Sequence, residues 1–266
     1  MNLSKEVSDS IKVTDFHIIS ESEFRKFTLE WTKQVSSTNM SWEFFRRSDD
    51  HGVSHMLGQI YFNDATVQNL LSSVGVKKIN ARFAIVDDYE PYEITSRVFT
   101  LVLYASDSQG KRCSAYHVGR PQYDYAVFFP EKKEPQDIGD FISSRLAQRW
   151  INDWKTVYHD CAKLPHSLGE LFLTSYGYLN GYNYIMSDFM YTLFPPGTQI
   201  IDHGVVVLPV IHKHVRHDPE GLPIWQRTFG LVLAGVEPNT TNQLVNSSQL
   251  VNSFYDLSLP TPPENN

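Results

Sequence analysis

The densest group of side chains that could support chemistry is a histidine-rich run between two β-prone segments. It contains His212, His214, His217 and Asp218. Alternate residues of a strand face the same side, so His212 and His214 would lie together. Imidazole and carboxylate groups are ligands of zinc and iron, and a metal held here would support hydrolysis in a cleft between the two halves of the chain. The run therefore makes a metal-dependent hydrolase with bound zinc or iron one hypothesis.

The same residues also fit an ordinary turn. The string His217-Asp-Pro-Glu-Gly221 is rich in turn-forming residues, and histidines on an extended hairpin are commonly solvated. A structural zinc site needs four ligands, and a catalytic site needs three ligands within a shaped pocket. We favour the turn, and we expect no cofactor.

A tyrosine-rich segment is the second candidate. It carries Tyr176, Tyr178, Tyr182 and Tyr184, interspersed with glycine and asparagine. Tyrosine offers a broad contact area with a polar tip, and such composition is typical of recognition surfaces. The alternative is that these tyrosines line the core, which we favour because large aromatic side chains are mostly buried.

Other catalytic patterns are missing from the sequence. There is no G-x-S-x-G nucleophile elbow, and neither glycine-rich phosphate-binding string occurs. Cys161 lies two residues from His159 on a predicted helix, so their side chains diverge. The sequence thus favours a protein that is not an enzyme.

Charge and hydrophobicity limit the partners. The 266 residues include 30 acidic and 23 basic ones, for a net charge of −7, without a long block of like charge. Nucleic acid is therefore not an expected partner. The first ten residues lack an apolar signal region, and no apolar stretch is long enough to span a bilayer. We expect a cytoplasmic protein without a membrane partner.

Hydrophobic spacing predicts helices and strands in the first half of the chain. Ser20 and Glu23 form a capping box for a helix over 21–35, and Asn63 or Asp64 caps a second helix with Val67 and Leu70 inward. Strands are predicted over 79–86 and 98–104 as a hairpin, and over 112–118 and 123–129.

The second half begins after a predicted linker and has the same order of elements. Residues 130–136 contain two prolines and four charged residues, which oppose regular structure. The predicted elements that follow are a helix over 138–162 carrying Ile142, Leu146, Trp150, Trp154 and Val157, a helix capped by Ser187 or Asp188, and strands over 200–211 and 223–236 joined by a connection over 212–222.

Local sequence similarity accompanies this order. Arg97–Leu103 and Arg227–Leu233 are identical at five of seven positions, and Ile60–Asp64 aligns with Tyr184–Asp188. We therefore predict an α+β protein of two tandem repeats related by a pseudo-two-fold axis, each with two helices packed on an antiparallel sheet. The predicted boundaries are 14–129 for the first repeat, 130–136 for the linker, 137–257 for the second repeat and 258–266 for a disordered tail.

The first repeat resembles a known type of domain. Trp31 in a helix, Tyr61-Phe-Asn-Asp64 opening a second helix, and Leu101-Val-Leu103 running to Asp107-Ser-Gln-Gly110 are similar to an uncharacterised small single-copy domain family of Bacteroidetes. The second copy fits more loosely over 138–237. The resemblance implies a recurrent α+β unit in a bacterial cytoplasm and supplies no catalytic residue.

These observations favour one function class. We expect a non-enzymatic binding or assembly protein that acts through contacts with a protein partner or through self-association into an oligomer. If single-copy relatives pair as dimers, a tandem fusion would make that pairing intramolecular and would let each half diverge. The metal-dependent hydrolase remains the alternative.

Overall fold

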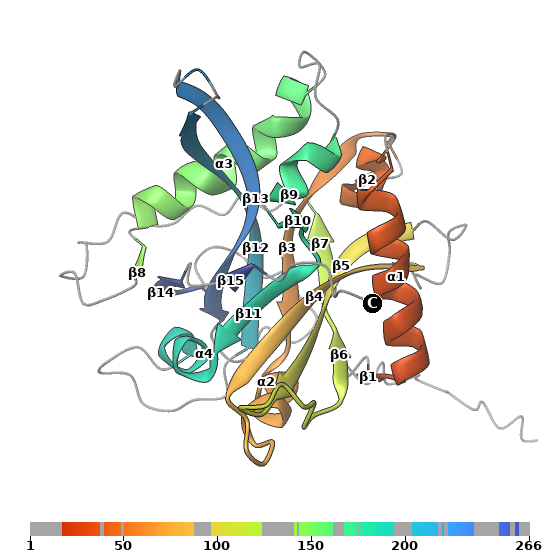
Figure 1. Ribbon diagram of the computed structural model, residues 1–266, viewed down its shortest axis with the longest axis vertical. Helices are drawn as coiled ribbons and strands as arrows, with labels where there is room; N and C mark the ends of the chain where they lie inside the picture. The colour runs from red at the N-terminus through yellow and green to blue at the C-terminus, as the bar shows by residue number, and fades with distance from the viewer. Residues whose placement is uncertain are drawn as a thin grey trace, which may run out of the picture.

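The computed structural model describes residues 18–37, 40–48, 51–87, 97–123, 141–142, 144–161, 168–174, 176–193, 204–217, 220, 223–236, 250–255 and 259–260. Within these ranges the chain forms a mixed α+β structure with antiparallel sheets (Figure 1), as the sequence predicts. The helices are α1 (Glu21–Val35), α2 (Asp64–Leu71), α3 (Ser144–Cys161) and α4 (Met186–Leu193), with 3-10 turns η1 (Trp42–Phe45) and η2 (Leu168–Phe172). None of the described helices has the length and apolar character needed to cross a lipid bilayer.

The first sheet is built around the hairpin of β4 and β5. Its order is β1 (Ile18–Ile19), β6 (Tyr116–Val118), β5 (Arg97–Ser106), β4 (Lys78–Asp87), β11 (Gly181–Ile185) and β15 (Leu259–Pro260). Every neighbouring pair is antiparallel. Leu259 and Pro260 lie in the segment that the sequence assigns to a terminal tail, and here they pair with β11.

The second sheet is built around the hairpin of β12 and β13. Its order is β8 (Phe141–Ile142), β14 (Leu250–Tyr255), β13 (Pro223–Val236), β12 (Gly204–His217), β3 (Ser54–Phe62) and β2 (Arg46–Ser48), with β7 (Arg120–Tyr123) also paired to β3. The strands β9 (Leu173–Thr174) and β10 (Gly177–Tyr178) form a separate small hairpin.

Each sheet contains strands from both halves of the chain. β3 of the first half pairs with β12, placing Ile60 opposite Val207, and β11 of the second half pairs with β4, placing Tyr184 opposite Ile79. Figure 1 shows β11 beside β4 and β3 beside β12. The predicted arrangement, in which each unit has a sheet of its own, therefore differs from the observed one. The two halves share one large core, because a single cluster of buried residues includes Trp31, Phe99, Trp154 and Phe229.

The helices of the first half begin where local sequence predicts. Ser20 accepts a hydrogen bond from the Glu23 backbone while the Glu23 carboxylate accepts one from the Ser20 backbone, so the predicted capping box is present and α1 covers 21–35. Asn63 caps α2 by accepting a bond from Thr66, and Val67 and Leu70 are buried. Both starts are confirmed because capping is a local interaction.

The helices of the second half begin elsewhere than predicted. Ile142 lies in β8 and not in a helix, and α3 starts at Ser144. The buried face of α3 carries Ala147, Ile151, Trp154 and Val157, whereas Leu146 is exposed. Helix α4 starts at Met186, ahead of both predicted caps.

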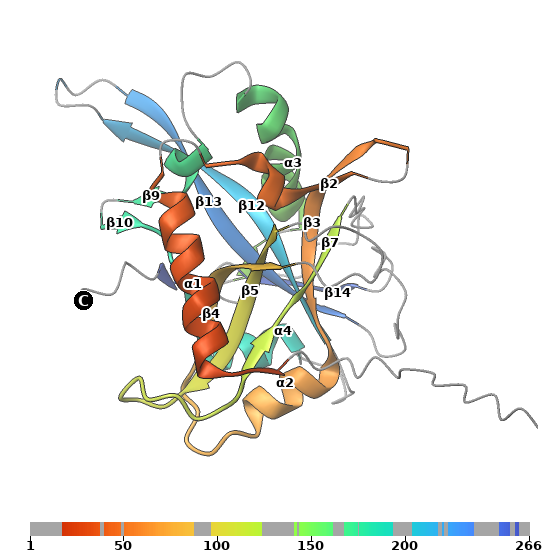
Figure 2. The same ribbon diagram turned by 90° about the vertical axis from the view of Figure 1, so that its right-hand side faces the viewer.

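The connection predicted over 212–222 was also partly wrong. β12 continues through the histidine-rich run to His217, and its partner β13 begins at Pro223, so the hairpin projects beyond the body of the molecule (Figures 1 and 2). The strand predicted over 112–118 shortens to β6. β7 lies ahead of the strand predicted over 123–129 and shares only Tyr123 with it, and residues 124–129 and the linker over 130–136 lie outside the described residues.

Helices α1 and α3 each lie along the hairpin of one sheet. α1 packs along β4 and α3 along β12, as Figure 2 shows. The indole Nε1 of Trp31 in α1 donates a hydrogen bond of 2.8 Å to the Leu179 carbonyl, and that of Trp154 in α3 donates one of 2.8 Å to the Leu57 carbonyl. Both indoles are fully buried, so each helix is fixed to the backbone of the opposite half of the chain, α1 between β10 and β11 and α3 at β3.

An aromatic cluster fills the space between the two helices. Trp31 lies 5.1 Å from Phe99 and Trp154 lies 5.3 Å from Phe229, measured between ring centroids. Phe99 and Phe229 are themselves 6.1 Å apart in an edge-to-face contact. Edge-to-face aromatic pairs add stability beyond the apolar area that they bury. This cluster makes the described chain one packed unit.

Candidate partner-binding surface

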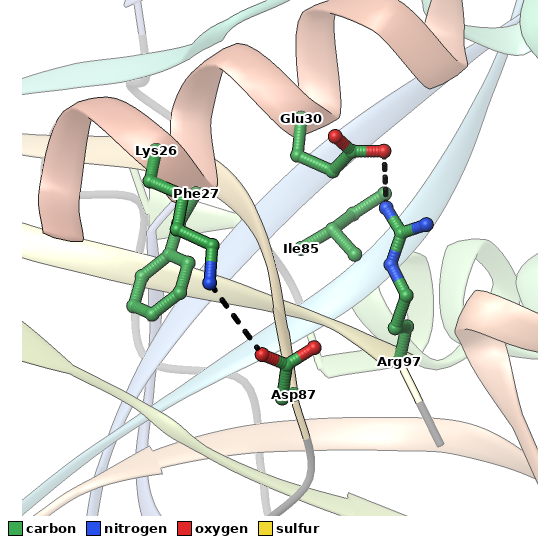
Figure 3. A pocket seen from close by; sticks show the side chains of 6 residues that line it. All are labelled: Lys26, Phe27, Glu30, Ile85, Asp87 and Arg97. Carbon is green, nitrogen blue, oxygen red and sulfur yellow. Dashed lines mark hydrogen bonds and ion pairs between the residues drawn. The ribbon is translucent and has the colours of Figure 1, made fainter. Parts of the chain in front are cut away.

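A small hollow lies between α1 and the end of the β4–β5 hairpin. Figure 3 shows its lining, with Lys26, Phe27 and Glu30 from α1, Ile85 and Asp87 from β4, and Arg97 from β5. Its volume is about 100 Å³. Small-molecule sites usually enclose roughly 300–1,000 Å³. This hollow is therefore too small to hold a typical cofactor or substrate.

The charges around the hollow neutralise one another. Lys26 Nζ lies 3.7 Å from Asp87, and Arg97 forms an ion pair with Glu30. Gln34 donates a 2.8 Å hydrogen bond to Glu30, and this bond, together with the Arg97 pair, lowers the pKa of the Glu30 carboxyl. Asp87 and Arg97 also lie directly opposite each other in the strand ladder, an arrangement that favours opposite charges. This surface thus satisfies its own charges.

The corresponding surface beside α3 carries an excess of positive charge. Lys213 of β12 forms an ion pair with Asp153 of α3, and Lys213 lies directly opposite Arg227 of β13. Arg145 and Arg149 are exposed and one helical turn apart on α3. Like charges placed directly opposite each other in a ladder reduce stability. We call Arg145, Arg149, Lys213 and Arg227 the basic face.

The histidine-rich run forms the strand beside this face. His212 is half-buried, its ring centroid lies 4.3 Å from that of Trp150, and its ring covers Gly230, where an added Cβ would meet Nε2 at 2.2 Å. His214 lies opposite Gln226 and His217 opposite Pro223, whereas Asp218 falls outside the described residues. In the described part of the chain, no three His, Cys, Asp or Glu side chains gather as metal ligands.

The tyrosine-rich segment divides between core and surface. Tyr182 and Tyr184 are buried, and the Tyr182 hydroxyl donates a 2.6 Å hydrogen bond to the Phe229 carbonyl. Tyr178 is half-buried, and Tyr176 is 76% exposed. The core interpretation therefore holds for Tyr182 and Tyr184, while Tyr176 is available to a partner.

Sequence reasoning did not single out His117. This residue of β6 is 1% exposed, and neither ring nitrogen has a hydrogen-bond partner among the described residues. Burial lowers the pKa of the His117 imidazole, because the charged form loses its hydration. His117 lies in the strand predicted over 112–118. Successive side chains of a strand face opposite sides, and this was the available signal that His117 could face the core.

No protein-family model, no curated protein and no solved structure matches the chain. The arrangement of the chain's own residues is therefore what indicates a function.

Proposed function

We propose that this chain is a non-enzymatic binding protein made of two copies of one α+β unit, fused as an intramolecular pair about a pseudo-two-fold axis. In this proposal the pair acts through contacts with a protein partner, and the basic face is the contact surface. Three sets of observations support the proposal: the order of the elements, the reciprocal contacts between the halves, and the difference in charge between the two helix–hairpin surfaces.

The order of elements supports the duplication. Each half runs from a two-residue strand through a long helix, a 3-10 turn, a short strand pair, a short helix and a long hairpin to two further strands. The long strand β3 of the first half takes the place of both β10 and β11 in the second half. The counterparts also pair alike: β1 with β6 and β8 with β14, β2 with β3 and β9 with β10, β7 with β3 and β15 with β11. Common descent explains this agreement, because unrelated halves would share neither the order nor the partners.

The reciprocal contacts support the pseudo-two-fold axis. Trp31 and Trp154 each bond to a carbonyl of the opposite half, and β3 and β11 each join the sheet of the opposite half. A two-fold interface has this property, since each contact is made twice with the roles of the two units exchanged. A homodimer of single units, later fused, would leave the same pattern.

The charges have diverged between matching positions. Aligning the starts of α1 and α3 matches Lys26 with Arg149 and Glu30 with Asp153, and the hairpin registers match Asp87 with Lys213 and Arg97 with Arg227. The opposite-charge pair Asp87 and Arg97 is thus replaced by the like-charge pair Lys213 and Arg227. This replacement carries the proposal, because it changes a surface whose charges balance into one with an excess of positive charge, which a negatively charged partner can contact.

The metal-dependent hydrolase is less well supported. It draws on His212, whose ring already packs on Trp150 and over Gly230. The binding proposal uses residues whose side chains reach the surface, namely Arg145 and Arg149.

Photo-cross-linking in native cells tests the proposal. A photo-reactive amino acid would replace Gln148 on α3, with Arg25 on α1 as the matched control, because the two positions correspond in the helices. We expect protein adducts from the Gln148 position and few from the Arg25 position. Light scattering on the purified chain measures its oligomeric state, and so shows whether a second copy of the chain is the partner. A strictly monomeric chain that forms no protein adduct from either position would contradict the proposal.

A further inference from the structure

We infer that the basic face binds an acidic polypeptide segment that also carries apolar side chains. This inference rests on the proposed binding function and adds the chemistry of the partner. It starts from four cations that three elements carry: Arg145 and Arg149 on α3, Lys213 on β12 and Arg227 on β13.

Helix α3 and the β12–β13 hairpin hold these cations in place. Asp153 lies one helical turn after Arg149 and pairs with Lys213, so α3 and β12 are joined at this point. The rings of Trp150 on α3 and His212 on β12 also contact each other, with their centroids 4.3 Å apart. The side chains of the basic face are therefore carried by packed secondary structure, which reduces the entropy lost when a partner binds.

The charge balance favours an anionic partner. Around the Lys213–Asp153 ion pair, the described residues add Arg145 and Arg149 of α3, which are exposed, and Arg227 of β13, in a chain whose net charge is −7. A local positive surface on an acidic protein steers negatively charged partners to that surface. At the matching surface of α1, Lys26 and Arg97 are paired with Asp87 and Glu30.

Two observations favour a polypeptide over a nucleic acid. The net charge of −7 opposes a long polyanion, because binding of nucleic acids depends on many phosphate contacts. Leu146, which follows Arg145 in α3, is 37% exposed. Trp150, one helical turn after Leu146, is half-buried. A segment with both carboxylates and apolar side chains can contact both kinds of group.

Fluorescence anisotropy with the full chain tests this inference. The probe is a labelled glutamate-rich peptide containing leucine, and its lysine-substituted version serves as the peptide control. We expect binding of the acidic peptide at low salt that weakens at high salt, as ion pairing requires. Arg149→Glu should weaken binding by about tenfold, whereas Lys26→Glu, at the matching position of α1, should leave it within about twofold. Circular dichroism would confirm that both variants are folded, and Arg145→Glu provides a second variant on the basic face.

The outcomes separate this inference from the proposed function. Absence of acidic-peptide binding, or equal losses in Arg149→Glu and Lys26→Glu, would overturn the acidic specificity. An RNA oligonucleotide that binds more tightly than the peptide, and loses binding in Arg149→Glu, would assign the face to nucleic acid instead. If the Gln148 position still cross-links to a protein while the acidic peptide fails to bind, the binding function stands and only the partner chemistry is wrong.

Discussion

Trp31 donates its indole hydrogen bond to the Leu179 carbonyl, which lies 148 positions further along the chain. Trp154 makes the same bond back to Leu57, 97 positions earlier. Both carbonyls belong to buried residues. These two bonds tie each long helix to the opposite half, and they make the stability of the two halves interdependent.

We expect Trp31→Phe and Trp154→Phe to destabilise the protein by similar amounts. Each substitution leaves a buried carbonyl without its donor, at a cost of about 1–3 kcal/mol, in addition to the loss of packing volume. Urea unfolding followed by circular dichroism measures the free energy of unfolding. A large effect from one substitution and none from the other would contradict the matched roles of the two indoles.

We expect a chain cut between its halves to stay together. Cleavage at a protease site inserted within 130–136 would break the covalent link between the two halves. The pairing of β3 with β12 and of β4 with β11 would remain, because these strand pairs join the two fragments. After cleavage the fragments should elute as one species in size-exclusion chromatography and should separate in denaturant. Fragments that elute as two folded species under native conditions would show that the pairing of β3 with β12 and of β11 with β4 does not hold the halves together.

We expect Gly181→Ala to be strongly destabilising. Gly181 has φ +147°, and an added Cβ would meet the Ala81 carbonyl oxygen at 2.0 Å, so the pairing of β11 with β4 would have to shift. The backbone strain alone costs about 1–3 kcal/mol, and the overlap adds to it. Gly110→Ala is the matched control. Gly110 has φ +80° with no atom within 4 Å of the added Cβ, so this variant should lose about 1–2 kcal/mol, measured by thermal or urea unfolding.

We expect the free energy of unfolding to fall as the pH drops below about 6.5, the ordinary pKa of histidine. The pKa of the buried His117 imidazole is lowered, so below pH 6.5 the unfolded chain binds a proton that the folded chain does not. The stability contribution is complete above that pH and is lost as the pH falls toward the folded pKa, with a slope of at most about 1.4 kcal/mol per pH unit.

Urea unfolding between pH 5 and pH 8 checks the His117 prediction. His117→Leu should reduce the slope of stability against pH in the acidic part of this range. His51→Leu, at an exposed position, should leave the slope close to that of the unmodified chain. An unchanged slope in His117→Leu would assign the pH dependence to other groups.

The sequence predicted elements whose signals are local. The cap of α1 at Ser20, the cap of α2 at Asn63 and the bounds of β13 all follow from residues within a few positions of each feature. The β4–β5 hairpin was also predicted, because β-forming runs flank turn residues. Short-range hydrogen bonds and side-chain alternation account for these successes.

Elements that depend on distant partners were missed or misplaced. β3 is buried on both faces and includes Gly58 and Gln59, so it lacks the alternation of a half-buried strand. The histidine-rich run was assigned to a connection because its residues are polar, but pairing with β13 extends β12 through it. Of the candidate site, the tyrosine and histidine runs were visible in sequence, whereas the basic face depends on α3 lying beside the β12–β13 hairpin.

The strands β3 and β11, which each join the sheet of the opposite half, also affect folding during translation. A ribosome releases β3 well before it has translated β12, so β3 must wait beside β7 with an open edge until the second half emerges. Neither sheet can be completed while the chain is still short. Exposed strand edges in incomplete chains promote aggregation. The risk of aggregation is therefore greatest while the second half is being translated, and chaperones that bind the open edge of β3 would act in that period.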